Sequence, residues 1–69
     1  MGVLNTIELE GVSDESWGAA AREALAEAAK TIRHIIKMDV LETSCNVSEN
    51  SIIEYRTSVR LYFEVEPSR

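Results

Sequence analysis

Charged side chains at spacings of two residues are the strongest candidates for binding chemistry in this sequence. Lys37 and Asp39 lie two residues apart, and so do Arg56, Ser58 and Arg60 nearer the C-terminus. Residues two apart in a β-strand project from the same face, so each set would gather on one side of a sheet. The charges either form solvated cross-strand ion pairs or set the register and specificity of an interface.

Residues suited to catalysis or to a zinc centre are sparse. His34 is the only histidine and Cys45 the only cysteine among 69 residues. No glycine-rich phosphate loop and no zinc-ligand spacing accompanies them. Reactive thiols need an electropositive setting, which Ser44 and Asn46 do not provide. We therefore expect no enzymatic activity, no internal disulfide and no structural zinc site.

The balance of charge argues against nucleic acid as a partner. Seven basic residues against twelve acidic ones give a net charge of -5, whereas neutralising phosphates requires the opposite balance. The N-terminus does not read as a signal peptide, and nowhere do about eighteen apolar residues follow one another. The sequence therefore predicts a soluble, cytoplasmic protein with no membrane partner.

The clearest structural element covers residues 52–65. Its even positions are polar except for Ile52 and Tyr62, and this alternation predicts a half-buried β-strand. Its odd positions are apolar, aromatic or β-branched, namely Ile53, Tyr55, Thr57, Val59, Leu61, Phe63 and Val65.

Alternation also predicts a first strand over residues 3–10, ended by Gly11, with Ser13 as the N-cap of a helix. Strong helix formers then run from Ser16 to about Thr31. Apolar residues recur at helical spacing and leave a buried stripe made mostly of alanine, which lets the helix approach a sheet closely. We expect Trp17 to plug the core from the first turn.

A second strand is expected from about residue 36 to about residue 47. Its pattern blurs after Leu41, as a bulge or a change of partner strand would cause. The polar residues 48–51 predict a hairpin turn into the third strand.

These elements predict one α+β domain over residues 1–69, a three-stranded antiparallel sheet wrapped around one helix. A chain this short removes only about 60% of its unfolded surface from water, so it needs a further stabilising device. The second sheet face has nothing within the chain to cover it, which favours assembly with other copies. Its apolar members are Leu4, Leu41, Ile52 and Tyr62.

The order, spacing and total length of several segments resemble the dodecin family. The resemblance implies a β-α-β-β protomer, twelve copies of which form a hollow shell. It also implies storage of flavin without catalysis, in pockets where the outer sheet faces of neighbouring subunits meet. The matching segments are Ile7-Glu8-Leu9-Glu10-Gly11-Val12-Ser13, Ser16-Trp17, Lys30-Thr31-Ile32-Arg33, Met38 to Val40, and Tyr55-Arg56 ahead of Phe63.

The resemblance places the ligand site at Lys37, Asp39, Tyr55 and Arg56, with Arg56 expected across from Lys37. Flavin-binding members carry a ring-stacking Trp where this chain has Lys37, and a ring-binding Gln where it has Arg56. Stacking is worth on the order of 1–3 kcal/mol per ring, so we expect weakened binding of riboflavin or FMN. The two cations could instead attract a phosphate or other anion, or pair with Asp39 and fill the pocket.

The alternative function is a cation-binding or purely structural assembly. Twelve chains at -5 each carry a charge of -60, a field that concentrates counter-ions. Acidic oxygens suit calcium or magnesium, and the sequence indicates no particular set of metal ligands.

Overall fold

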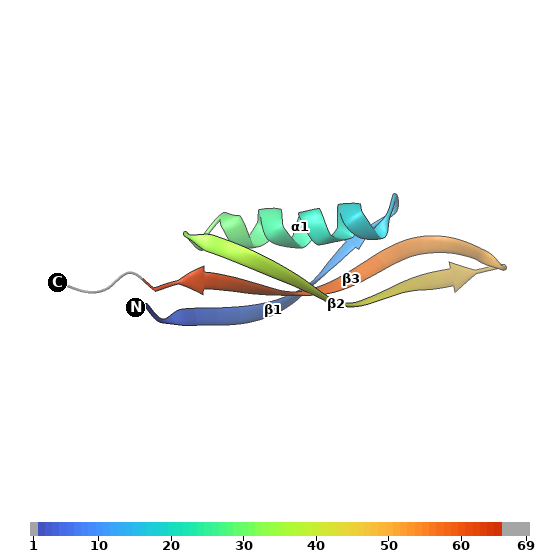
Figure 1. The fold of residues 1–69 in the computed structure, drawn as a ribbon. Coiled ribbons are helices and arrows are strands. Elements are labelled where there is room, and N and C mark those ends of the chain that lie inside the picture. The colour runs from blue at the N-terminus through green and yellow to red at the C-terminus, as the bar shows by residue number, and fades with distance from the viewer. Residues whose placement is uncertain (1, 66–69) are drawn as a thin grey trace.

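The chain folds into a three-stranded sheet with one helix on one face (Figure 1). The computed structural model describes residues 2–65, with β1 at Leu4–Ser13, α1 at Trp17–Ala29, β2 at Ile35–Ser48 and β3 at Ser51–Glu64. The strand order is β1-β3-β2, and both pairings are antiparallel. The predicted β-α-β-β fold is therefore confirmed. No helix within residues 2–65 is long and apolar enough to cross a membrane.

The central strand β3 contributes the most deeply buried side chains of the sheet to the core, as its alternation predicts. Val59 and Leu61 are fully buried beneath α1, and Thr57 beside them is 1% exposed. Full burial of an aliphatic side chain of this size contributes roughly 1.5–3 kcal/mol. The odd residues of β3 therefore face the helix, and its even residues face the other way.

The N-cap of the helix lies three residues later than the sequence predicts. Its N-cap is Ser16, whose Oγ accepts a hydrogen bond from Ala19 N at 3.0 Å. Ser13 cannot cap the helix because it still belongs to β1, where it pairs with Tyr55. Its Oγ instead accepts a bond from Glu15 N at 2.9 Å and closes the turn between the two elements.

Small residues bring α1 unusually close to β1. The buried stripe of the helix consists of Ala20, Ala21, Ala24 and Ala28. Gly11 lies below it, and a Cβ atom built on Gly11 would stand 1.8 Å from the carbonyl oxygen of Ala20. Gly11 was expected to end the first strand, yet β1 continues to Ser13. The glycine is needed for this close approach of the two backbones rather than for a turn.

Trp17 is not the core plug that its position predicts. Its side chain is 39% exposed, and its ring packs edge-on against Tyr55 at 4.9 Å between centroids. The indole N–H donates a 2.7 Å hydrogen bond to the carbonyl oxygen of Ser44. Alanine and aliphatic side chains make up the core. Trp17 lies beside it and links the start of α1 to β2 through this hydrogen bond.

Two extra residues on β2 change which of its side chains face the helix. The pairing with β3 shifts at Ile36 and again at Leu41, where the sequence predicts a bulge. Lys37 and Asp39 therefore share a face with the even-numbered residues that follow Leu41. The turn residues Glu49 and Asn50 have φ angles of 52° and 64°, which suits a two-residue hairpin.

The protomer is elongated and leaves apolar residues uncovered. Its radius of gyration is 14.5 Å, against about 11 Å for a compact chain of this length. Figure 1 shows the hairpin end of β2 and β3 projecting past the end of α1. Val47, Ile52 and Ile53 near that end are each about half exposed. A second molecule is needed to remove these side chains from water.

Candidate functional site

The sheet face opposite α1, here called the outer face, carries most of the predicted site. Antiparallel pairing puts paired residues on one side of the sheet, and the odd residues of β3 occupy the helix side. Charged and polar residues from all three strands therefore gather on the outer face. They are Glu8 and Glu10 from β1, Lys37 and Asp39 from β2, and Glu54, Arg56, Ser58, Arg60 and Tyr62 from β3.

Lys37, Asp39 and Tyr62 form one connected cluster on this face. Lys37 pairs with Tyr62 across the strands, and its ammonium lies 4.7 Å from the centroid of the ring. The Tyr62 hydroxyl donates a 2.7 Å hydrogen bond to Asp39 Oδ2. The Lys37 ammonium is also 3.8 Å from Asp39 Oδ1. The expectation that Lys37 and Asp39 project to the same side is confirmed, and Tyr62 joins them.

Arg60 extends this cluster towards β1. Its Nε and Nη2 donate to Glu8 Oε2 at 3.1 and 2.8 Å, and Asp39 is its pairing partner on β2. Hydrogen bonding to Glu8, and then to Tyr62, raises the pKa of the guanidinium above its ordinary value. Arg60 is therefore a permanent positive charge beside the Tyr62 ring.

Arg56 belongs to a separate cluster, and the expectation that it lies across from Lys37 is wrong. It pairs with Val12 on β1 and with Ser44 on β2. It lies six positions along β3 from Tyr62, the partner of Lys37, which corresponds to about 20 Å of strand. Lys37 and Arg56 cannot hold one small group together within a protomer.

The partners of Arg56 are carboxylates of two strands. Its Nη1 lies 3.1 Å from Glu10 Oε1 and its Nη2 lies 3.4 Å from Glu54 Oε2. Glu54 also accepts a 2.9 Å hydrogen bond from the side-chain amide of Asn46. This chain of contacts reaches from β1 across β3 to β2 and neutralises the arginine.

Tyr55 does not join the other expected site residues. As an odd residue of β3 it faces the helix side, where its ring contacts Trp17. Cys45 pairs with it on β2 and is a half-buried strand residue with a free thiol. Within one protomer, Tyr55 supports the packing of α1 and does not present its ring to a ligand on the outer face.

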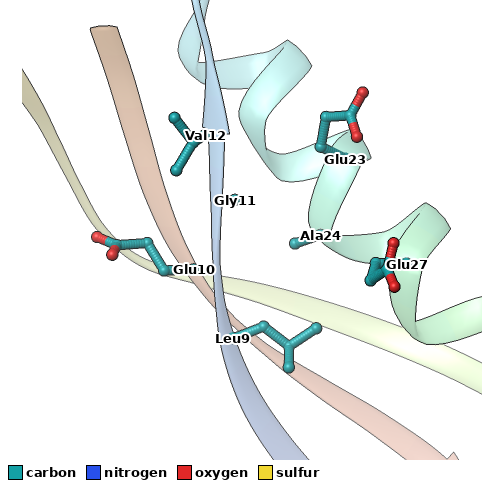
Figure 2. Close-up of a pocket in the computed structure, with 7 residues that line it drawn as sticks. All are labelled: Leu9, Glu10, Gly11, Val12, Glu23, Ala24 and Glu27. Carbon is teal, nitrogen blue, oxygen red and sulfur yellow. The ribbon is translucent and has the colours of Figure 1, made fainter.

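A cavity of about 390 Å³ lies between β1 and α1 and shares Glu10 with the cluster around Arg56. Figure 2 shows two carboxylates on the helix beside the strand, Glu23 and Glu27, while Glu10 points away from the helix. The remaining lining residues are Leu9, Gly11, Val12 and Ala24. Within residues 2–65, no group of three or more His, Cys, Asp or Glu side chains is placed to hold a metal ion.

Several site partners were not assigned from the sequence, although a signal for them existed. Glu8 and Glu10 alternate along the first strand and would meet the arginines of the third once the two strands are paired. Tyr62 stood out as an aromatic residue among polar positions. Counting outward from the predicted turn at residues 48–51 pairs Lys37 with Tyr62, but only because the extra residue Ile53 on β3 offsets the extra residue Leu41 on β2.

Comparison with known proteins supports the resemblance that the sequence shows to the dodecin family. A model of the family described as Dodecin matches residues 3–66. A dodecin of Thermus thermophilus is 36% identical over 64 residues, covering 93% of this chain and 93% of the relative. A calcium dodecin of Mycobacterium tuberculosis is 30% identical over 69 residues, covering 100% of this chain and 97% of the relative.

Solved structures agree along the whole described fold. An arginine-to-alanine variant of the T. thermophilus dodecin superposes with a TM-score of 0.93 at 34% identity, covering 99% of this chain and 100% of that one. The calcium dodecin of M. tuberculosis gives a TM-score of 0.82 at 31% identity, with 97% and 96% covered. The family model and these relatives each span more than nine tenths of the sequence, and this chain therefore belongs to the dodecin family.

Proposed function

We propose that this chain is a non-enzymatic binding protein that assembles into a hollow dodecamer and holds a small ligand between the outer faces of neighbouring copies. The observation that carries the proposal is the outer face itself. No element within residues 2–65 covers it, and it combines the aromatic ring of Tyr62 with ordered charges. A face of this kind is suited to an interface that also holds a ligand.

Assembly is supported by the shape of the protomer. The radius of gyration exceeds that of a compact chain, and exposed apolar side chains line the hairpin end. Chains below about 70–80 residues rarely supply enough core to be stable alone. Twelve copies of a 7.7 kDa chain give about 92 kDa, so size-exclusion chromatography with light scattering tests the assembly. A stable species near 7.7 kDa would rule it out.

Flavin remains the ligand to test first, and we expect its binding to be weak. Lys37 rests on Tyr62 and contacts Asp39, so this part of the outer face is covered by the chain's own side chain. Arg56 is held by two carboxylates and presents no amide to a flavin ring. We propose that Lys37, Asp39 and Arg56 border the ligand at the interface.

The direct measurement is a titration of riboflavin or FMN with the purified protein, following flavin fluorescence. Dodecin-type storage predicts quenching as the ring is stacked, with weak affinity in this chain. No quenching at micromolar protein would remove flavin as the ligand, while the sizing result would still decide whether the assembly exists.

A second candidate function is the binding of a divalent cation. It is favoured by the similarity to a calcium dodecin along the whole chain and by the excess of acidic residues. Since no metal cluster exists within residues 2–65 of one protomer, the ligands would come from several copies. Melting temperatures with calcium and with EDTA test this, and equal values would count against a structural ion.

A further inference from the structure

The surroundings of Tyr62 indicate which class of ligand the outer face takes, an inference that rests on the proposed function for the location of the site. Tyr62 supplies the one aromatic ring on this face within residues 2–65. Its hydroxyl is held by Asp39 at 2.7 Å, so the direction of the ring is fixed. Its partner on β1 is Thr6, and Leu4 follows on the same face. Short or apolar side chains therefore border the ring on the β1 side.

The side chain that covers the ring on the β2 side is weakly held. The ammonium of Lys37 lies 4.7 Å from the ring centroid and 3.8 Å from Asp39, and the side chain is 60% exposed. Exposed ion pairs and exposed cation–π contacts are each weak, and a lysine stem has four rotatable bonds. Lys37 can therefore move off the ring without unfolding any element.

We propose that Tyr62 and Lys37 form a site for a planar aromatic anion, whose ring stacks on Tyr62 and whose acidic group pairs with the Lys37 ammonium. A neutral ring must displace the ammonium and leave it without an equivalent partner. A cationic ring must compete with an ammonium that is already tethered beside Tyr62. An anionic ring exchanges one contact of the ammonium for a stronger, charge-assisted one.

The neighbouring charges permit this exchange. Asp39 keeps the hydroxyl of Tyr62 as a donor and has Arg60 opposite it on β3 after Lys37 moves away. Arg60 is in turn paired with Glu8. The net charge of -5 opposes an anion at long range, but salt at physiological strength screens charges beyond about 8 Å. The local contact with Lys37 therefore decides the preference.

A matched pair of probes isolates the acidic group. 2-Naphthoate and 2-naphthamide share the same ring and nearly the same size, and only the first is charged. Ligand-observed NMR at physiological salt measures both affinities on the assembled protein. We expect the wild-type protein to bind 2-naphthoate at least about fivefold more tightly, since one charge-assisted contact accounts for such a ratio.

Three variants assign the preference to its residues. Lys37→Gln should reduce the ratio of the two affinities to about one, whereas Lys30→Gln, which removes the same charge from the exposed end of α1, should leave the ratio unchanged. Tyr62→Leu should weaken both probes. Light scattering and circular dichroism on each variant show that the assembly and fold persist.

The proposal is overturned if assembled wild-type protein binds neither probe, binds both equally, or keeps its preference after Lys37→Gln. Failure of the proposed function looks different. A monomer in light scattering would remove the assembly, and with it the location of this site, before either probe is added. Absent flavin quenching would remove flavin and leave the comparison of the two naphthalene probes as it stands.

Discussion

Lys37 lies directly opposite Tyr62 on the neighbouring strand, with its ammonium 4.7 Å from the ring centroid. This pair occupies the part of the outer face where flavin-binding dodecins are expected to present a stacking ring. In this chain the ring on the outer face is that of Tyr62, and the ammonium of Lys37 lies over it.

Replacing Lys37 and Arg56, the two residues that differ from those of flavin-binding dodecins, should strengthen flavin binding. The double change Lys37→Trp and Arg56→Gln supplies a stacking ring and an amide, so we expect riboflavin to bind at least tenfold more tightly, given about 1–3 kcal/mol per stacked ring. Fluorescence quenching measures the affinity. The matched control is Lys30→Trp with Arg22→Gln on the helix surface. An unchanged affinity in the first variant would show that the pocket lies elsewhere.

Gly11→Ala should be strongly destabilising. The new Cβ would stand 1.8 Å from the carbonyl oxygen of Ala20, so strand and helix must separate. We expect a loss of about 3 kcal/mol in the free energy of unfolding, at the upper end for overpacking, measured by urea denaturation at matched protein concentration. In Gly18→Ala the added Cβ meets nothing closer than 3.6 Å, and higher helix propensity should add about 1 kcal/mol. Equal effects of the two substitutions would contradict this account of Gly11.

Thr57→Val tests the hydrogen bond between the side chain of Thr57 on β3 and the start of α1. Thr57 Oγ1 donates to the carbonyl oxygen of Trp17 at 2.9 Å, and the side chain is 1% exposed. Losing this bond while the shape is kept should cost about 1 kcal/mol. Thr43→Val, on the exposed opposite residue of β2, should change stability by no more than about 0.5 kcal/mol. A loss of equal size at both positions would mean that strand propensity, and not the hydrogen bond, sets the cost.

The hairpin turn can be improved without touching the site. Glu49 and Asn50 both have positive φ angles, a conformation that costs most non-glycine residues about 1–2 kcal/mol and that asparagine tolerates better. The pair Glu49→Asn and Asn50→Gly supplies the residues that a type I′ turn favours. We expect the free energy of unfolding to rise by about 1 kcal/mol, with unchanged naphthoate affinity. A destabilised variant would show that the turn geometry differs.

Arg60 should make no pH-dependent contribution near neutrality. Hydrogen bonding to Glu8 raises its pKa, so the stability that comes from its charged form is fully present below the ordinary arginine value. That contribution is lost only when the pH rises through the raised value. The stability difference between wild type and Arg60→Gln should therefore be the same at about pH 7 and about pH 9. A marked change between these two values would refute this account of Arg60.

Periodicity was sufficient to predict the elements of the fold. The alternation of residues 52–65 and the alanine stripe of the helix each reflect a single repeating environment, so the third strand and the helix could be identified from the sequence. Trp17 could not be placed in this way, because it lies at the side of the core, where exposure depends on what the alanines have already filled. Ser16 and Ser13 are equally good caps by type, and the length of β1 decides between them.

The candidate site depends on register, which periodicity alone does not determine. Lys37 and Asp39 share a face by spacing, and the structure keeps them together. Arg56 required the correct pairing of β2 with β3, and its partner is Ser44 rather than Lys37. Tyr55, which the family resemblance also suggested as a ligand position, lies on the helix side, away from Lys37, Asp39 and Arg56.

The extra residues at Ile36 and Leu41 also affect how the sheet meets other strands. β2 is an edge strand, and its free backbone groups would otherwise form an uninterrupted template for a foreign chain. Each bulge breaks the even spacing of those groups and increases the local twist. Removing Leu41 would make the side-chain alternation of β2 continuous through this region. It would also reduce the local twist of this edge strand. Leu41 thus makes the exposed edge of β2 a less regular template for an added strand.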